Sequence, residues 1–137
     1  MLNYSYPILI ASILGLLAAG NVMSQDTSIS SQLPDPLSAG WRGEAVCEEL
    51  HNTEEQRVLR CTFPPGIGHE RHFHAPHFGY ALSGGKMRLT DASGVRDVTL
   101  KSHSYFASEG TAWHEVVNIG DTTVIYLIIE PKLIIEP

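Results

Sequence analysis

Short stretches in which hydrophobic and polar residues alternate recur along most of the chain. Alternation with a period of two is typical of a β-strand with one buried face, and turn-forming residues separate the stretches. No segment after residue 24 shows a sustained helical period with a cap. The pattern therefore predicts an all-β sandwich or barrel with little helix. The expected strands are 45–50, 57–63, 77–82, 86–90, 95–100, 104–107, 113–118 and 122–129.

One connection between these strands is predicted in detail. The sequence Asp91-Ala92-Ser93-Gly94 separates two alternating runs, and its glycine is free to adopt the positive φ that tight turns require. We expect a β-hairpin at this point.

The first 24 residues contain no charged side chain, and residues 7–20 form an apolar stretch. This stretch has the length of a signal-peptide core and is short for a membrane span. We expect residues 1–24 to be a signal peptide that is cleaved after Ser24, which would export the protein to the periplasm or the medium. An uncleaved N-terminal anchor is the alternative, because the usual basic residues are missing.

The remaining residues are expected to comprise a polar arm at 25–43, one domain at 44–131 and a short tail at 132–137. The chain has 137 residues, of which 43% are hydrophobic, enough for a single core. The net charge is −6, and an acidic surface disfavours nucleic acid and anionic membranes as partners. We expect no nucleic-acid partner and no stable membrane contact after cleavage.

The two cysteines, Cys47 and Cys61, lie in neighbouring expected strands. If the turn between these strands centres on Glu54, the two residues are cross-strand neighbours within the range that a disulfide tolerates. An exported protein with this register is expected to form the disulfide. A pair of reduced core thiols is the alternative.

Histidines supply the candidate chemistry, because four of the seven lie between His69 and His77. Neutral imidazole is the commonest metal ligand in proteins. His72 and His74 are two residues apart, so both rings project from the same face of a strand. His114 opens a later extended stretch, and a strand facing the first pair would bring its ring to the same ion.

The spacing Gly66-x5-His72-x-His74, followed by Gly84-Gly85 and then by Gly110-x3-His114-x3-Asn118, resembles the paired sequence motifs of the cupin superfamily. The wider stretch 57–123 is similar to small single-domain cupins. The resemblance implies a jelly-roll barrel of the double-stranded β-helix type and a divalent ion of iron, manganese, nickel, copper or zinc held by His72, His74 and His114. It also implies a homodimer that pairs through edge strands.

The chain departs from this motif at one position. Cupins place a glutamate four or five residues after the second histidine, where this chain has Phe78 and Gly79. Neither side chain binds metal, so the expected inner shell consists of three neutral imidazoles with open positions. His77 is the nearest substitute, but the parity of a regular strand turns it outward unless a bulge at Pro76 reverses that parity.

The other polar and aromatic residues near the histidines are not expected to bind the metal. Tyr80 shares the parity of His74 and is, with His77, a candidate for acid or base work, although a core tyrosine with a satisfied hydroxyl is the alternative. His69 is expected at the mouth of the barrel or facing solvent. Asn118 is expected to support its strand or contact the pocket. Glu70 and Glu115 are not expected to be metal ligands, because alternation along their strands points them away from the face that carries the histidines.

The first functional hypothesis is an exported, metal-dependent small-molecule enzyme with dioxygenase-like chemistry, because three neutral ligands suit an Fe(II) centre that binds substrate and O2 together. The second is a non-catalytic cupin that binds a small ligand or a metal, and the missing glutamate favours it. A metal-free barrel with histidines as pocket polar groups is the third possibility. The substrate and the metal are not defined by the sequence.

Overall fold

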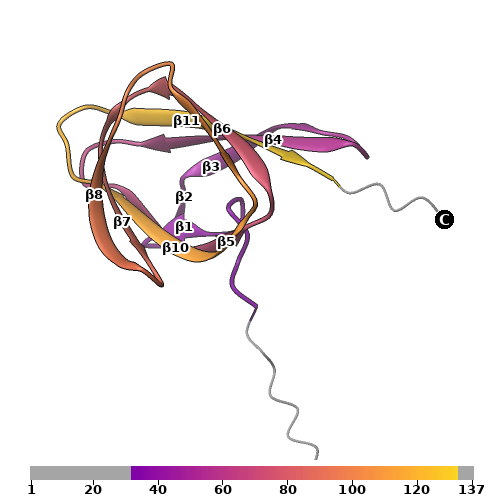
Figure 1. The fold of residues 1–137 in the computed structure, drawn as a ribbon, viewed down its shortest axis with the longest axis horizontal. Helices are drawn as coiled ribbons and strands as arrows, with labels where there is room; N and C mark the ends of the chain where they lie inside the picture. The colour runs from indigo at the N-terminus through magenta and orange to yellow at the C-terminus, as the bar shows by residue number, and fades with distance from the viewer. Residues whose placement is uncertain (1–31, 133–137) are drawn as a thin grey trace, which may run out of the picture. The chain divides into compact units, whose positions relative to one another are not determined.

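A computed structural model describes residues 32–132 (Figure 1). The predicted signal peptide lies outside the described residues, as do residues 25–31 of the predicted arm and 133–137 of the predicted tail. The described residues contain no helix, and hence no helix that could cross a membrane.

The described residues form strands in three antiparallel sheets, and all eight strands expected from the alternating pattern are present. The four-stranded sheet has the order β5 (Gly68–His74), β10 (Thr111–Asn118), β7 (Gly85–Asp91), β8 (Gly94–Leu100). The five-stranded sheet has the order β3 (Cys47–Asn52), β4 (Gln56–Phe63), β11 (Val124–Pro131), β6 (His77–Ser83), β9 (Tyr105–Ser108). A small hairpin consists of β1 (Gly40–Trp41) and β2 (Glu44–Ala45). The predicted all-β class is confirmed.

The hydrophobic core lies between the two larger sheets, which Figure 1 shows curving around a common interior. Strand β11 illustrates how the sequence builds it, since Val124, Tyr126, Ile128 and Glu130 alternate inward with less buried neighbours. The largest wholly buried side chains include Phe63 and Leu59 from β4 and Met87 from β7. The inward faces of the two sheets thus provide both the core and the walls of the candidate site.

Two local expectations are met. Asp91 pairs with Gly94 across the β7–β8 hairpin, where Gly94 has a φ of 114°. Cys47 and Cys61 are cross-strand partners of β3 and β4, with a Cα–Cα distance of 4.0 Å, and they form a disulfide. The bridge links the edge strand of the five-stranded sheet to its neighbour.

The segment before β1 packs against the two sheets. The backbone N–H of Phe73 donates to the carbonyl oxygen of Pro34 at 3.1 Å, and Pro36 is fully buried. Asp35 forms an ion pair with Arg57 of β4 at 2.6 Å. These contacts hold the segment against the strands that carry the histidines.

Candidate metal centre

The structure brings the rings of His72, His74 and His114 together on the interior surface. The Nε2 atom of His72 lies 3.0 Å from that of His74 and 3.0 Å from that of His114. All three candidate ligand atoms lie within 4.8 Å of one another. Two adjacent strands provide them, because β5 carries the pair and β10 places His114 directly opposite His72.

A backbone contact fixes the tautomer of the central ring. The Nδ1–H of His72 donates to the carbonyl oxygen of Glu70 at 2.6 Å. Since a neutral imidazole carries one proton, the lone pair of His72 is then on Nε2, where the three rings meet. This is the protonation pattern of a metal-ligating histidine whose second nitrogen is hydrogen-bonded.

Burial also keeps two of these rings neutral. Burial, helped by the neighbouring histidines, lowers the pKa of His72 to about 2. Burial likewise lowers the pKa of His114 to about 3, again helped by nearby histidines. Both rings therefore offer lone pairs at neutral pH, with no bound proton to displace.

The arrangement of donors fits a divalent transition-metal ion. Two nitrogens at right angles around an ion, each with a bond of about 2.1 Å, are separated by about 3.0 Å. The observed separations of 3.0 Å match this value. Three imidazoles suit the first-row ions from iron to zinc without selecting one of them.

Strand β6 is where the sequence-based orientation is wrong. His77, Gly79 and Ala81 are buried, whereas Phe78 and Leu82 are exposed. The interruption at Ala75 and Pro76 between β5 and β6 resets the alternation, so parity counted from His74 does not carry across it. The motif position that faces the interior and lacks its glutamate is therefore Gly79.

His77, expected to point outward, lies inside against His74, with ring centroids 4.6 Å apart. Its Nδ1–H donates to the carbonyl oxygen of Ala75 at 2.8 Å, which leaves the lone pair on Nε2. Burial lowers its pKa. His77 is not one of the three converging ligands, but it lines the cavity beside them.

Tyr80, expected inside the barrel, belongs to the opposite face of β6. Its hydroxyl lies 3.2 Å from Nδ1 of the exposed His103. The inward tyrosine is instead Tyr126 of β11, which lines the cavity with His114. Burial raises the pKa of Tyr126, so its phenol stays protonated.

His69 is also misplaced by the sequence argument, because it is fully buried and not at the mouth. Its ring lies 3.8 Å from that of His72, and its Nε2 is 3.3 Å from the carbonyl oxygen of Ala39. Burial lowers its pKa to about 4. His69 thus forms the layer behind His72.

Asn118 supports the turn that follows β10. Its amide donates to the carbonyl oxygens of Phe63 and Thr122, both at 2.7 Å, and its Oδ1 accepts from Gly120. Neither Glu70 nor Glu115 belongs to the group of converging ligands.

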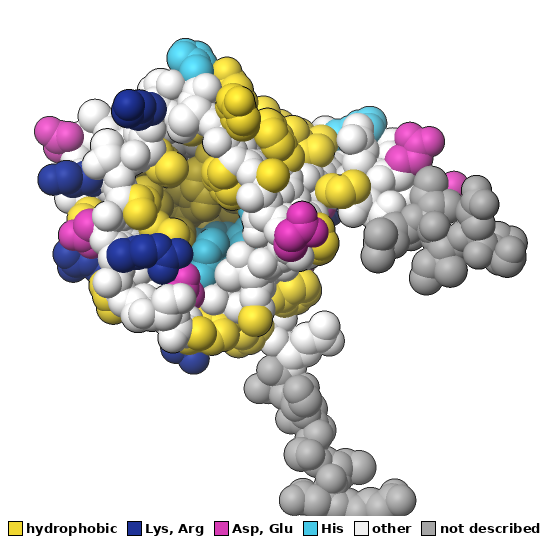
Figure 2. Space-filling view, in the orientation of Figure 1, with side chains coloured by type: hydrophobic (Ala, Val, Ile, Leu, Met, Phe, Trp, Pro, Cys, Tyr) yellow, Lys and Arg dark blue, Asp and Glu magenta, His cyan; other side chains and the backbone are white. Residues whose placement is uncertain are grey.

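Two of the three histidines, His74 and His114, line a cavity of about 250 Å³ together with His77. Figure 2 shows it as a hollow with histidine at its floor, hydrophobic side chains around it and charged side chains at the rim. Arg96 and Asp91, which form an ion pair at 2.7 Å, belong to its lining. A second, almost wholly apolar cavity of about 90 Å³ shares four lining residues with the first: Leu89, Phe106, His114 and Tyr126.

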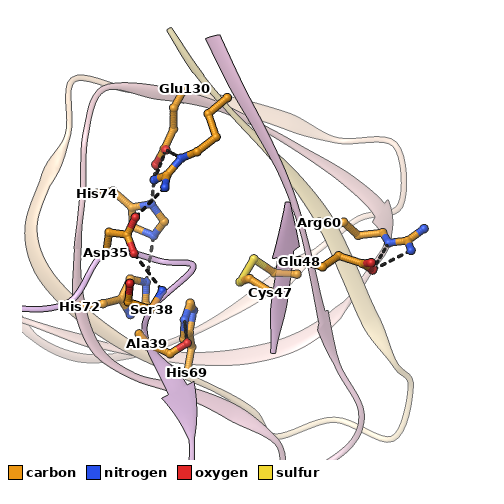
Figure 3. The surroundings of a disulfide bond; sticks show 12 residues. Asp35, Ser38, Ala39, Cys47, Glu48, Arg60, His69, His72, His74 and Glu130 are labelled. Atoms are coloured by element: carbon orange, nitrogen blue, oxygen red, sulfur yellow. Dashed lines mark hydrogen bonds and ion pairs between the residues drawn. A yellow bond between two sulfur atoms is a disulfide. The ribbon is translucent and has the colours of Figure 1, made fainter. Parts of the chain in front are cut away.

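Sequence reasoning missed one buried carboxylate beside the site. Glu130 is 4% exposed, and its Oε1 lies 3.8 Å from Nδ1 of His74 (Figure 3). Its other oxygen accepts hydrogen bonds from Arg57 at 2.8 and 2.6 Å. The signal was present in the alternation of β11, whose inward positions end at residue 130.

Comparison with known proteins supports the fold. No protein-family model and no curated protein matches the sequence. A cupin domain protein from Bordetella pertussis Tohama I superposes with a TM-score of 0.61 at 22% identity, covering 64% of this chain and 93% of that one. The polyketide cyclase RemF from Streptomyces resistomycificus gives a TM-score of 0.56 at 17% identity, covering 74% and 75%.

A predicted oxalate decarboxylase from Thermotoga maritima is also similar, with a TM-score of 0.50 at 22% identity over 76% of this chain and 96% of that one. The chain therefore has the cupin fold, as the motifs around the histidines indicated. At these identities the likeness defines the fold and leaves the reaction open.

Proposed function

We propose that the protein is an exported, metal-dependent cupin enzyme that carries out dioxygenase-like chemistry on a small organic molecule at a three-histidine centre. The convergence of three imidazole nitrogens, beside a cavity that His74 and His114 line, carries this proposal. A divalent ion held there by His72, His74 and His114 would supply open positions at which substrate and dioxygen bind together.

The cavity supports a small and largely apolar substrate. Leu89, Phe106 and Ile128 belong to its walls, and the adjoining cavity extends the apolar surface past His114. Most of such a molecule would contact hydrocarbon, which removes water from the reacting groups.

Two residues of the cavity wall provide proton chemistry. His77 is neutral, with its Nε2 lone pair available, and is placed to accept a proton from a substrate. Tyr126 keeps its proton and is placed to donate a hydrogen bond. Tyr80 is left out of this scheme because its hydroxyl is on the outer face.

Export is supported by the disulfide between Cys47 and Cys61, because such bonds persist in oxidising compartments. N-terminal sequencing of protein recovered from the periplasm or medium tests this part of the proposal. A chain beginning near Gln25 is expected, and an intact Met1 would contradict cleavage.

A homodimer is the proposed assembly. Strand β11 is a central strand of its sheet, whereas β9 is an edge. Exposed hydrophobic side chains lie on the outer face of β9 and β6: Phe78, Leu82 and Tyr105. Light scattering of the purified protein tests the assembly, and a monomer at micromolar concentration would contradict it.

The second candidate function is a non-catalytic cupin that binds a small ligand or a metal. The absence of a carboxylate at Gly79 favours it, because the centre lacks the anionic ligand of the cupin motif.

Metal analysis followed by an oxygen-uptake screen separates the two candidates. Native protein is expected to contain one ion per chain and to consume O2 with a member of a panel of carboxylates, thiols and catechols. The matched His114→Ala protein is expected to do neither. Metal without turnover across the panel would favour the binding protein, and absence of metal from the wild type would contradict both candidates.

A further inference from the structure

Glu130 lies in an environment that demands an explanation. A carboxylate with 4% exposure is costly to bury unless its charge is compensated, and one of its oxygens, Oε1, has no hydrogen-bond partner. Nδ1 of His74 is also buried without a partner, and the two atoms face each other at 3.8 Å. A hydrogen bond between them would satisfy both atoms.

Metal binding by His74 would give its Nδ1 atom a proton to donate to Glu130. If Nε2 of His74 binds a metal, its single proton resides on Nδ1, the atom that faces Glu130. The 3.8 Å separation becomes an ordinary N–H···O hydrogen bond after a movement of about 0.6 to 1.1 Å. A metal-bound histidine with its second nitrogen on a carboxylate is a recurrent and strong arrangement.

Arg57 holds the carboxylate in this orientation. Its Nε and Nη2 donate to the Oε2 atom of Glu130, which leaves Oε1 directed at His74. Asp35 binds the remaining face of Arg57 through Nη1 at 2.6 Å. Glu130 therefore has one oxygen bonded to Arg57 and the other facing His74.

The position of Glu130 also relates it to the missing motif residue. Gly79 pairs with Ile128 across β6 and β11, and Glu130 is the next inward residue along β11. An acidic side chain is thus present on the neighbouring strand, behind the histidine and not in the inner shell.

We propose that Glu130 is a positioning residue of the metal centre: it accepts the Nδ1 proton of His74, directs Nε2 of that ring toward His72 and His114, and supplies the negative charge that the motif position lacks. This inference rests on the proposed metal site.

Titration of the purified full-length chain with Co²⁺ against a competing chelator tests the proposal. Glu130→Gln removes the charge with little change in shape and is expected to weaken Co²⁺ binding about 10- to 100-fold at unchanged stoichiometry. Glu48→Gln is the matched control, because Glu48 pairs with Arg60 on the surface. It is expected to bind Co²⁺ as the wild type does.

A second measurement uses the wild type, so it does not depend on whether Glu130→Gln folds. In the Zn²⁺-loaded wild type, long-range proton–nitrogen NMR spectra are expected to show His74 protonated on Nδ1, with a slowly exchanging proton shifted downfield. Where Glu130→Gln folds, that proton is expected to shift upfield and exchange faster. The Nδ1 proton of His72, bonded to the carbonyl of Glu70, is the internal reference.

The outcomes are distinct. A wild type that binds neither Co²⁺ nor Zn²⁺ overturns the metal site and this inference together. Metal binding by the wild type with unchanged Co²⁺ affinity in Glu130→Gln, or with His74 ligating through Nδ1, overturns the role of Glu130 alone.

Discussion

The ring of Phe106 occupies the space that a side chain at Gly79 would enter. The two residues pair across β6 and β9, and a Cβ built at Gly79 would collide with the Cζ and Cε1 atoms of the phenyl ring. The same ring packs edge-on against His77, with centroids 5.7 Å apart. The phenyl ring of Phe106 therefore fills the space that the side chain of the missing glutamate would need. The site beside the three histidines is closed by this packing at Gly79.

Restoring the glutamate should consequently depend on Phe106. Gly79→Glu alone is expected to destabilise the fold by about 1 to 3 kcal/mol, because the new side chain overpacks a filled site. Gly79→Glu combined with Phe106→Ala should recover part of that loss and bind Co²⁺ more tightly than the wild type. Denaturant unfolding of the two single variants and the double variant measures the coupling, and strict additivity would contradict the steric explanation.

Metal should stabilise the fold through the three histidines. A ligand present at 100 times its dissociation constant contributes about 2.7 kcal/mol, so Zn²⁺ is expected to raise the melting temperature of the chelator-treated protein. His114→Ala should abolish this rise, whereas the exposed His51→Ala should retain it. An equal rise in the wild type and in His114→Ala would place the bound ion elsewhere.

The sequence was sufficient for eight strands and for the three histidines that converge, whereas β1, β2 and β5 were not among the strands expected from alternation. Alternation marks strands wherever one face is buried, and the i, i+2 spacing of His72 and His74 is set by β-geometry alone. The cross-strand placement of Cys47 and Cys61 followed from counting residues to the turn. These features depend on local periodicity, which a single sequence displays.

The predicted orientation of the β6 side chains is wrong because the alternation of inward and outward positions can be counted only within one uninterrupted strand. The break at Ala75 and Pro76 exchanged the faces, so His77 entered the cavity and Tyr80 left it. Glu130 was missed for a different reason. Its partners, Arg57 and His74, come from two other strands, and only the sheet topology brings them together.

Removal of the disulfide should destabilise the protein without disturbing the candidate site. Constraining a loop with a sequence separation of 14 stabilises by about 3 kcal/mol in the chain-entropy model. Cys47→Ala with Cys61→Ala is expected to lose stability of this order while keeping the Co²⁺ affinity of the folded protein. Intact mass before and after reduction and alkylation provides the prior check, since an unchanged mass would exclude the bond.

Acid should unfold the metal-free protein through its buried histidines. The pKa values of His69, His72 and His114 are lowered to about 4, 2 and 3, whereas an unfolded histidine has the ordinary value of 6.5. Below pH 6.5 the unfolded chain therefore binds protons that the folded chain does not, and the free energy of unfolding falls as the pH falls. Each such histidine contributes about 1.4 kcal/mol per pH unit once the unfolded form is fully protonated.

Denaturant unfolding in the presence of a chelator, between pH 7 and pH 4.5, measures this slope. The free energy of unfolding is expected to fall progressively from pH 6.5 to pH 4.5. Near pH 4 His69 begins to bind its proton in the folded state as well, whereas His72 and His114 continue to lower the free energy of unfolding below that pH. His69→Asn should reduce the slope by about 1.4 kcal/mol per pH unit, since one titrating group is removed. The exposed His51→Gln serves as the control and should leave most of the slope in place. A free energy of unfolding that stays constant from pH 6.5 to pH 4.5 would mean that the folded protein accepts these protons, and that the histidines are not held neutral by burial.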